Sequence, residues 1–155
     1  MKNKIKLSLL LLAALFSVNV VLAKSLPDTA GLPIVTNFAN CFMHPNADIL
    51  RTILDDEAVM KMPRFNTVII QTKDQLTQEA QANAGTSQNC ASEISVLSSS
   101  NAILVAEVTF RYSDFQESVY VTVERSGEQW KITQMVKMFS DRPAATNRAS
   151  DITAQ

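Results

Sequence analysis

The first third of the chain places its apolar residues at helical spacing. One stripe follows the i, i+3, i+4, i+7 pattern of a helix face and comprises Val35, Phe38, Ala39 and Phe42. Pro33 suits the first turn of such a helix. Pro45 disfavours helical backbone at the residue before it, so the helix is expected to end at about residue 44.

Two further helices are predicted before residue 85. Asn46 is a suitable cap for the first, whose apolar stripe comprises Ile49, Leu50, Ile53 and Leu54. Thr72 and Gln75 have the spacing of a capping box, which starts the second, and Gly85 suits its C-terminal stop. Between these helices, the acidic run 55–57 predicts a polar turn, and residues 58–62 and 67–71 predict short strands, the first ended by Pro63.

After residue 89 the spacing changes to the period of two that strands show. Residues 90–97, 102–112, 116–125 and 130–139 predict four strands, and Ser126-Gly127 predicts a two-residue turn between the last two. Three helices followed by this antiparallel meander predict an α+β fold, with the helices packed on one face of the sheet.

The N-terminal residues differ from the rest of the chain. Lys2, Lys4 and Lys6 precede an apolar run over residues 7–16, and a short segment ends at Ala23. This layout is typical of a secretory signal peptide over residues 1–23. We therefore expect export, with the bacterial periplasm as the location and no membrane attachment after cleavage. Residues 24–31 predict a linker, residues 32–140 the folded domain, and residues 141–155 a disordered tail.

Charge and composition exclude several classes of function. The 155 residues carry a formal net charge of −1, and all 15 acidic residues but only 11 of the 14 basic ones follow residue 23. A mildly acidic domain of this kind is not expected to bind nucleic acid. No phosphate loop, dinucleotide fingerprint or metal-ligand spacing is present, so we predict neither a cofactor nor a metal site.

Cys41 and Cys90 are the only cysteines. An oxidising compartment permits a disulfide between them, whereas two buried free thiols would act as small apolar side chains. The sequence leaves both states open.

Two segments resemble the nuclear transport factor 2-like superfamily, which includes the ketosteroid-isomerase, polyketide-cyclase (SnoaL-like) and lumazine-binding branches. Residues 49–59 (ILRTILDDEAV) are similar to its helix, acidic turn and Ala-Val strand, and residues 127–133 (GEQWKIT) to its closing hairpin. The step at His44 and the final Trp-Lys-Ile strand look most like the lumazine-binding branch. The resemblance covers about residues 32–139.

The resemblance implies a cone-shaped, cystatin-like roll, in which the N-terminal helices pack in the concave face of a curved, mainly antiparallel sheet. It also implies a pocket inside the cone and a homodimer formed through the outer sheet face. If Trp130 and Ile132 point inward, the period of two predicts that Gln134, Val136 and Met138 do so too. The expected pocket residues are Phe38, Phe42, Met60, Met62, Arg64, Leu104, Ala106, Val108, Phe110, Tyr120, Gln134, Val136 and Met138.

This expected lining is mainly apolar and contains no acid. The residues nearest to a catalytic role are His44, Asp114 and Tyr112, because enzymes of the superfamily use an acid or histidine base with a tyrosine. His44 suits a helix C-terminal cap better than a catalytic role. Tyr112 and Tyr120 likewise suit strand positions with an apolar ring and a solvent-exposed hydroxyl better than ligand contacts.

Three functions follow, and whether the domain is an enzyme stays open. The first is a non-catalytic domain that binds a small apolar or aromatic ligand. The second is an isomerase, dehydratase or cyclase that acts by general acid–base chemistry. The third is a structural or partner-binding protein whose pocket is filled by its own side chains.

Overall fold

The computed structural model describes residues 29–141, which form three helices and six strands. The predicted signal peptide, most of the linker and the tail after residue 141 lie outside the described residues. No helix within the described range is long and apolar enough to cross a membrane. The elements are α2 (Leu32–Met43), α3 (Ala47–Ile53), β1 (Leu54–Arg64), β2 (Thr67–Thr72), α4 (Lys73–Ala82), β3 (Ala91–Ser99), β4 (Ile103–Arg111), β5 (Phe115–Ser126) and β6 (Gln129–Asp141).

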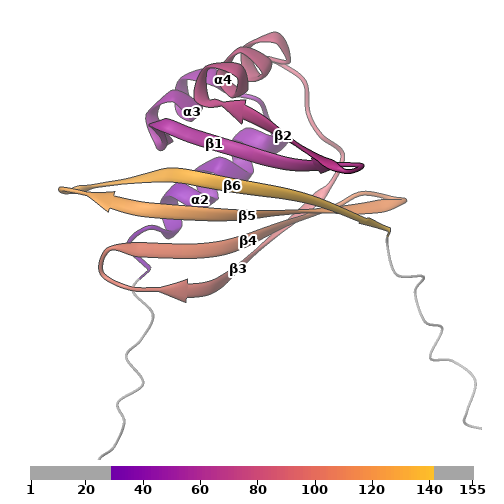
Figure 1. Ribbon diagram of the computed structural model, residues 1–155. Helices are drawn as coiled ribbons and strands as arrows, with labels where there is room; N and C mark the ends of the chain where they lie inside the picture. The colour runs from indigo at the N-terminus through magenta and orange to yellow at the C-terminus, as the bar shows by residue number, and fades with distance from the viewer. Residues whose placement is uncertain (1–28, 142–155) are drawn as a thin grey trace, which may run out of the picture.

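The strands form one curved sheet in the order β2-β1-β6-β5-β4-β3. All neighbours are antiparallel except β1 and β6, which run parallel. In Figure 1, α3 and α4 lie at the β1–β2 end of the sheet, and α2 crosses β6, β5 and β4. The predicted α+β class, with helices packed on one face of a mainly antiparallel sheet, is confirmed.

Local sequence signals set the helix boundaries. The Asn46 side chain accepts hydrogen bonds from the backbone N–H groups of Asp48 and Ile49, which lack helical partners. Thr72 and Gln75 form the expected capping box at the start of α4. These caps fix the positions at which α3 and α4 begin.

Two local predictions are wrong. Residues 55–57 belong to β1 rather than to a turn. The pairing of β1 with β6 is irregular between Leu54 and Val59, so this part of the strand bulges away from the sheet. The acidic side chains therefore reach solvent from within a strand. The last hairpin turn is shifted by one residue, because Ser126 pairs with Gln129, which leaves Gly127, at φ +64°, as the first residue of the turn.

Strand β4 contributes a fully buried row of side chains to the core beneath α2. Leu104, Ala106, Val108 and Phe110 alternate along β4 and have no exposed area. A Cβ atom on Gly31 would lie 3.1 Å from the Trp130 ring and 3.4 Å from Leu104, so the backbone before α2 approaches the sheet closely. Because α2 covers β4 along its length, these four side chains fill a solid core.

An extra residue in β6 reverses which face of the sheet each side chain in the second half of the strand points to. Thr122 pairs with Gln134 while Val123 pairs with Ile132, so Thr133 has no partner opposite it. Such a bulge reverses the alternation of side chains between the two faces. Ile132 and Met135 are consequently both fully buried against the helices, whereas Met138 is 46% exposed. The prediction that Gln134, Val136 and Met138 point inward is therefore wrong.

The bulge can be tested by a matched pair of substitutions in β6. Met135→Ala removes a fully buried side chain and is expected to lower the free energy of unfolding by about 2–5 kcal/mol. Met138→Ala removes the same side chain from the opposite face and should cost less than about 1 kcal/mol. Urea denaturation of both variants measures the difference. Equal losses would contradict the reversed facing.

Candidate functional site

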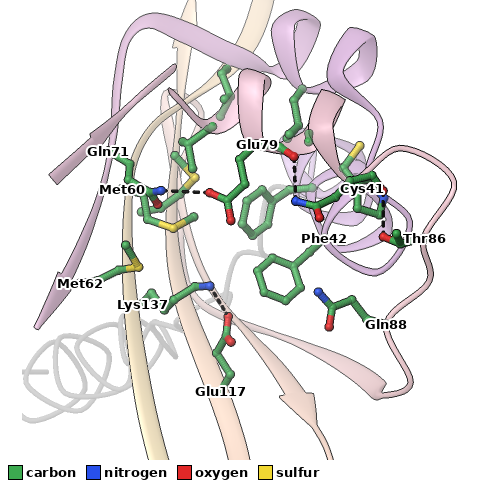
Figure 2. Close-up of a pocket in the computed structure, with 18 of the residues that line it drawn as sticks. Cys41, Phe42, Met60, Met62, Gln71, Glu79, Thr86, Gln88, Glu117 and Lys137 are labelled. Carbon is green, nitrogen blue, oxygen red and sulfur yellow. Dashed lines mark hydrogen bonds and ion pairs between the residues drawn. The ribbon is translucent and has the colours of Figure 1, made fainter. Parts of the chain in front are cut away.

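A cavity of about 530 Å³ lies between the sheet and the three helices. Side chains from α2, α3, α4, β1, β5 and β6 line it (Figure 2), and twelve of the twenty lining residues are apolar. The apolar lining comprises Phe38, Cys41, Phe42, Pro45, Leu50, Leu54, Met60, Met62, Leu76, Ala80, Phe115 and Met135. This volume lies within the range of small-molecule sites, about 300–1,000 Å³.

One ion pair lies among these apolar side chains. Glu117 on β5 and Lys137 on β6 pair across the two strands, and Lys137 Nζ lies 2.9 Å from Glu117 Oε1. The Glu117 side chain is 5% exposed and that of Lys137 is 15% exposed. Both therefore carry their charge in a place where water solvates it poorly.

Aromatic rings complete the surroundings of Lys137. Its Nζ atom lies 4.6 Å from the centroid of Phe42 and 5.7 Å from that of Phe139, within the range of a cation–π interaction. Phe42 is held from behind by Phe110, with the ring centroids 4.2 Å apart. The β4 core thus fixes the ring that faces the cation, as Figure 2 shows for Phe42 and Lys137.

Burial and the ion pair act on Glu117 in opposite directions. Burial raises the pKa of the Glu117 carboxyl above its ordinary value, and the charge and hydrogen bonding of Lys137 lower it by less. Oε1 is buried beside the Lys137 ammonium, whose Nζ lies 2.9 Å away. The ammonium therefore compensates the charge of the carboxylate, but less than burial disfavours it.

A polar rim surrounds the cavity on the side of α4. Gln71 Nε2 donates to Glu79 Oε2 over 3.0 Å, and Asn83 Nδ2 donates to the Glu79 carbonyl over 2.9 Å. The bond between Gln71 and Glu79 is drawn in Figure 2. Tyr112 Oη donates to Gln88 Oε1 over 3.1 Å and its ring stacks on that of Phe115. Burial is the main cause that raises the Tyr112 pKa, followed by the charges of Cys90 and Glu117.

The described residues contain no group of three or more histidine, cysteine or acidic side chains that could hold a metal. The chemistry that the cavity can offer is a buried carboxylate, an ammonium beside it, and a tyrosine hydroxyl at the rim. These groups can hydrogen-bond a ligand or move a proton.

Neither a family model nor a curated protein matches the sequence. Three solved structures resemble the fold, each of a nuclear transport factor 2-like protein of unknown function. That from Silicibacter pomeroyi has a TM-score of 0.61 at 17% identity and covers 72% of this chain and 94% of its own. Those from Shewanella baltica and Methylobacillus flagellatus have TM-scores of 0.57 and 0.56 at 9% and 12% identity, covering 73% and 70% of this chain and 91% and 88% of theirs.

The chain has the nuclear transport factor 2-like fold. The predicted resemblance to this superfamily is confirmed at the level of the fold. Closeness to the lumazine-binding branch stays a prediction, because the three similar proteins have no known function.

The nuclear transport factor 2-like fold places four of the expected pocket residues at the cavity and nine elsewhere. Phe38, Phe42, Met60 and Met62 line the cavity. Arg64 is exposed at the end of β1, and Tyr120, 37% exposed, pairs with Val136 on the outer face. The remaining expected residues lie in the core on β4 (Leu104, Ala106, Val108, Phe110) or on the outer face of the sheet in the second half of β6 (Gln134, Val136, Met138).

The three expected catalytic residues do not come together in the cavity. His44 is exposed and caps α2 through its backbone N–H, and its Nδ1 lies 3.2 Å from Ser87 Oγ. Asp114 is exposed in the bend between β4 and β5. Of the three, Tyr112 alone lines the cavity. The capping interpretation of His44 fits this geometry.

Both cysteines are free thiols in the structure. Cys41 is buried in the cavity wall, and burial raises its pKa, which disfavours the reactive thiolate. Cys90 is half-buried beside Tyr112. Of the two states that the sequence left open, the structure has the thiol state.

Sequence reasoning missed Glu117 and Lys137 for different reasons. Glu117 is in phase with Val119, Val121 and Val123 on β5, all fully buried, so extending that alternation by one step would have placed a carboxylate inward. Lys137 faces the cavity because of the bulge at Thr133, and no local pattern in the sequence indicates that bulge.

The raised pKa of Glu117 predicts a specific pH dependence of stability. Because the folded pKa lies above the unfolded one, the bound proton stabilises the fold at acid pH, and this contribution is lost as the pH rises through the folded pKa. Glu117→Gln removes the effect. The unfolding free energy of the wild type relative to Glu117→Gln should therefore fall as the pH rises through the folded pKa.

Chemical denaturation from about pH 4 upward measures this slope. Glu128→Gln, in the exposed β5–β6 turn, is the matched control and should follow the wild type. A difference between Glu117→Gln and the wild type that does not vary with pH would contradict a shifted carboxyl.

Proposed function

We propose that this domain binds a small, largely apolar ligand in its cavity. The observation that supports the proposal is a cavity of about 530 Å³ lined by twelve apolar residues and eight polar or charged ones, with one buried ion pair at its inner wall. Small-molecule sites combine apolar walls with polar groups that fix the orientation of the ligand. The cavity volume also argues against a pocket filled by the protein's own side chains.

Acid–base catalysis is a second candidate, favoured by one observation. Glu117 is a buried carboxyl with a raised pKa that lines the cavity, as a general base requires. His44 and Asp114, the residues first considered for that role, lie outside the cavity lining. A catalytic version of the proposal therefore depends on Glu117, with the Tyr112 hydroxyl at the rim.

Ligand binding can be tested by a thermal-shift screen of apolar and aromatic compounds. A ligand at 100 times its dissociation constant adds about 2.7 kcal/mol of stability, which should raise Tm by several degrees. Leu76→Trp, at the cavity wall on α4, should abolish the shift by filling the space.

Gln78→Trp is the matched control, because residue 78 is exposed on the same helix, and it should keep the shift. Hits that stabilise both tryptophan variants equally would place binding outside the cavity. A broad library without any hit would count against the proposal.

We also propose that the domain forms a homodimer through the outer face of the sheet. Several large apolar side chains are exposed there, on four different strands: Val68, Ile70, Ile103, Tyr120 and Met138. Exposed apolar side chains gathered on one face are characteristic of association surfaces, and the helices occupy the other face.

Tyr120→Lys is expected to dissociate this dimer. The substitution places a charge at the centre of the outer face, while Glu107 directly opposite on β4 can pair with it and preserve the fold. Sedimentation velocity at micromolar concentration should show a dimer for the wild type and a monomer for the variant. Glu128→Lys in the exposed turn should remain dimeric, and a monomeric wild type would refute the proposal.

A further inference from the structure

The ion pair between Glu117 and Lys137 balances the charge of the inner cavity wall. Among the residues that line the cavity, the only other charged side chain is Glu79, which is exposed at the rim. The inner wall therefore carries one positive and one negative charge, both largely removed from water.

The ion pair leaves hydrogen-bonding positions of both groups open to a ligand. Glu117 Oε1 is buried against Lys137 Nζ, 2.9 Å away. Lys137 Nζ has the carboxylate on one side and the Phe42 ring on another (Figure 2). A carboxylate has a second oxygen that accepts, and an ammonium has three N–H donors, so a ligand that donates to Glu117 and accepts from Lys137 adds bonds to the one within the pair.

The balance of one positive and one negative charge at the inner wall determines whether the ligand should be charged or neutral. An anion could bind Lys137, but Glu117 would then be left without a compensating charge, and a cation would leave Lys137 in that state. Breaking a buried pair in this way is strongly unfavourable. A neutral ligand that donates to Glu117 and accepts from Lys137 keeps both groups paired.

The geometry also limits where the two ligand groups sit. Oε1 and Nζ lie 2.9 Å apart, so the donor and the acceptor must occupy neighbouring positions on the ligand, as the nitrogen and oxygen of one amide do. The adjoining walls carry the Phe38 and Phe42 rings and the sulfur atoms of Met60, Met62 and Met135, which favour a flat aromatic body.

We infer that the cavity selects neutral aromatic molecules in which a hydrogen-bond donor adjoins an acceptor, with the Glu117–Lys137 pair as their anchor. The inference rests on the proposed ligand-binding function and specifies its ligand class. It assigns the ion pair a recognition role that depends on both charges together.

Four naphthalene probes of similar size test the inference on the wild-type protein at near-neutral pH. They are the naphthalene carboxamide, naphthoate, naphthylmethylammonium and methylnaphthalene, and their binding is measured by calorimetry or by quenching of naphthalene fluorescence. The carboxamide should bind at least about tenfold more tightly than either charged probe, and more tightly than methylnaphthalene.

Single substitutions should then redirect the selectivity. Glu117→Gln leaves the cation alone and should shift preference toward naphthoate, whereas Lys137→Gln should shift it toward naphthylmethylammonium. Glu93→Gln breaks an exposed ion pair with Arg111 on the far strands and should leave the order unchanged. A loss of folding would weaken all probes together and cannot produce opposite preferences.

The outcomes separate the two proposals. Tight binding of methylnaphthalene with no preference for the carboxamide, or a wild-type preference for a charged probe, overturns the inference and leaves cavity binding intact. Failure of every probe to bind the wild type and both cavity variants counts against the inference and the proposed function alike.

Discussion

A single unpaired residue in β6 decides what the cavity contains. Without the bulge at Thr133, strict alternation from Ile132 would direct Gln134 and Val136 toward the helices and Lys137 toward the outer face. With it, Met135 and Lys137 face the helices, and Lys137 meets Glu117 from the neighbouring strand. Met135 in the apolar wall and Lys137 in the ion pair both owe their facing to this one residue of extra length.

The division between core and cavity runs across the strands. The buried β4 residues 106, 108 and 110 lie at the same levels of the sheet as Met135, Lys137 and Phe139 on β6, with β5 between them. On the β4 side of the sheet these side chains have no exposed area, whereas β1 and β6 contribute side chains to the cavity wall. One face of the same sheet is therefore core under β4 and cavity wall at β1 and β6.

The sequence predicted the class of fold and the type of most elements, because these depend on local signals. The caps at Asn46 and Thr72, the stripe along α2 and the alternation along β5 are each contained in a few consecutive residues. The site was harder to predict, because whether an inward-facing residue lines the cavity depends on which strands the helices cover. Leu104 and Phe110 face inward as expected, yet they lie under α2 and reach no open space.

The only parallel pairing in the sheet has a consequence for how the domain assembles. β6 is the last strand in the sequence, yet it lies between β1 and β5 near the middle of the sheet. Until it is in place, the early hairpin of β1 and β2 and the later meander of β3 to β5 share no strand–strand hydrogen bonds. The two halves of the sheet can therefore join only after β6 has been synthesised, and folding depends on contacts distant in sequence.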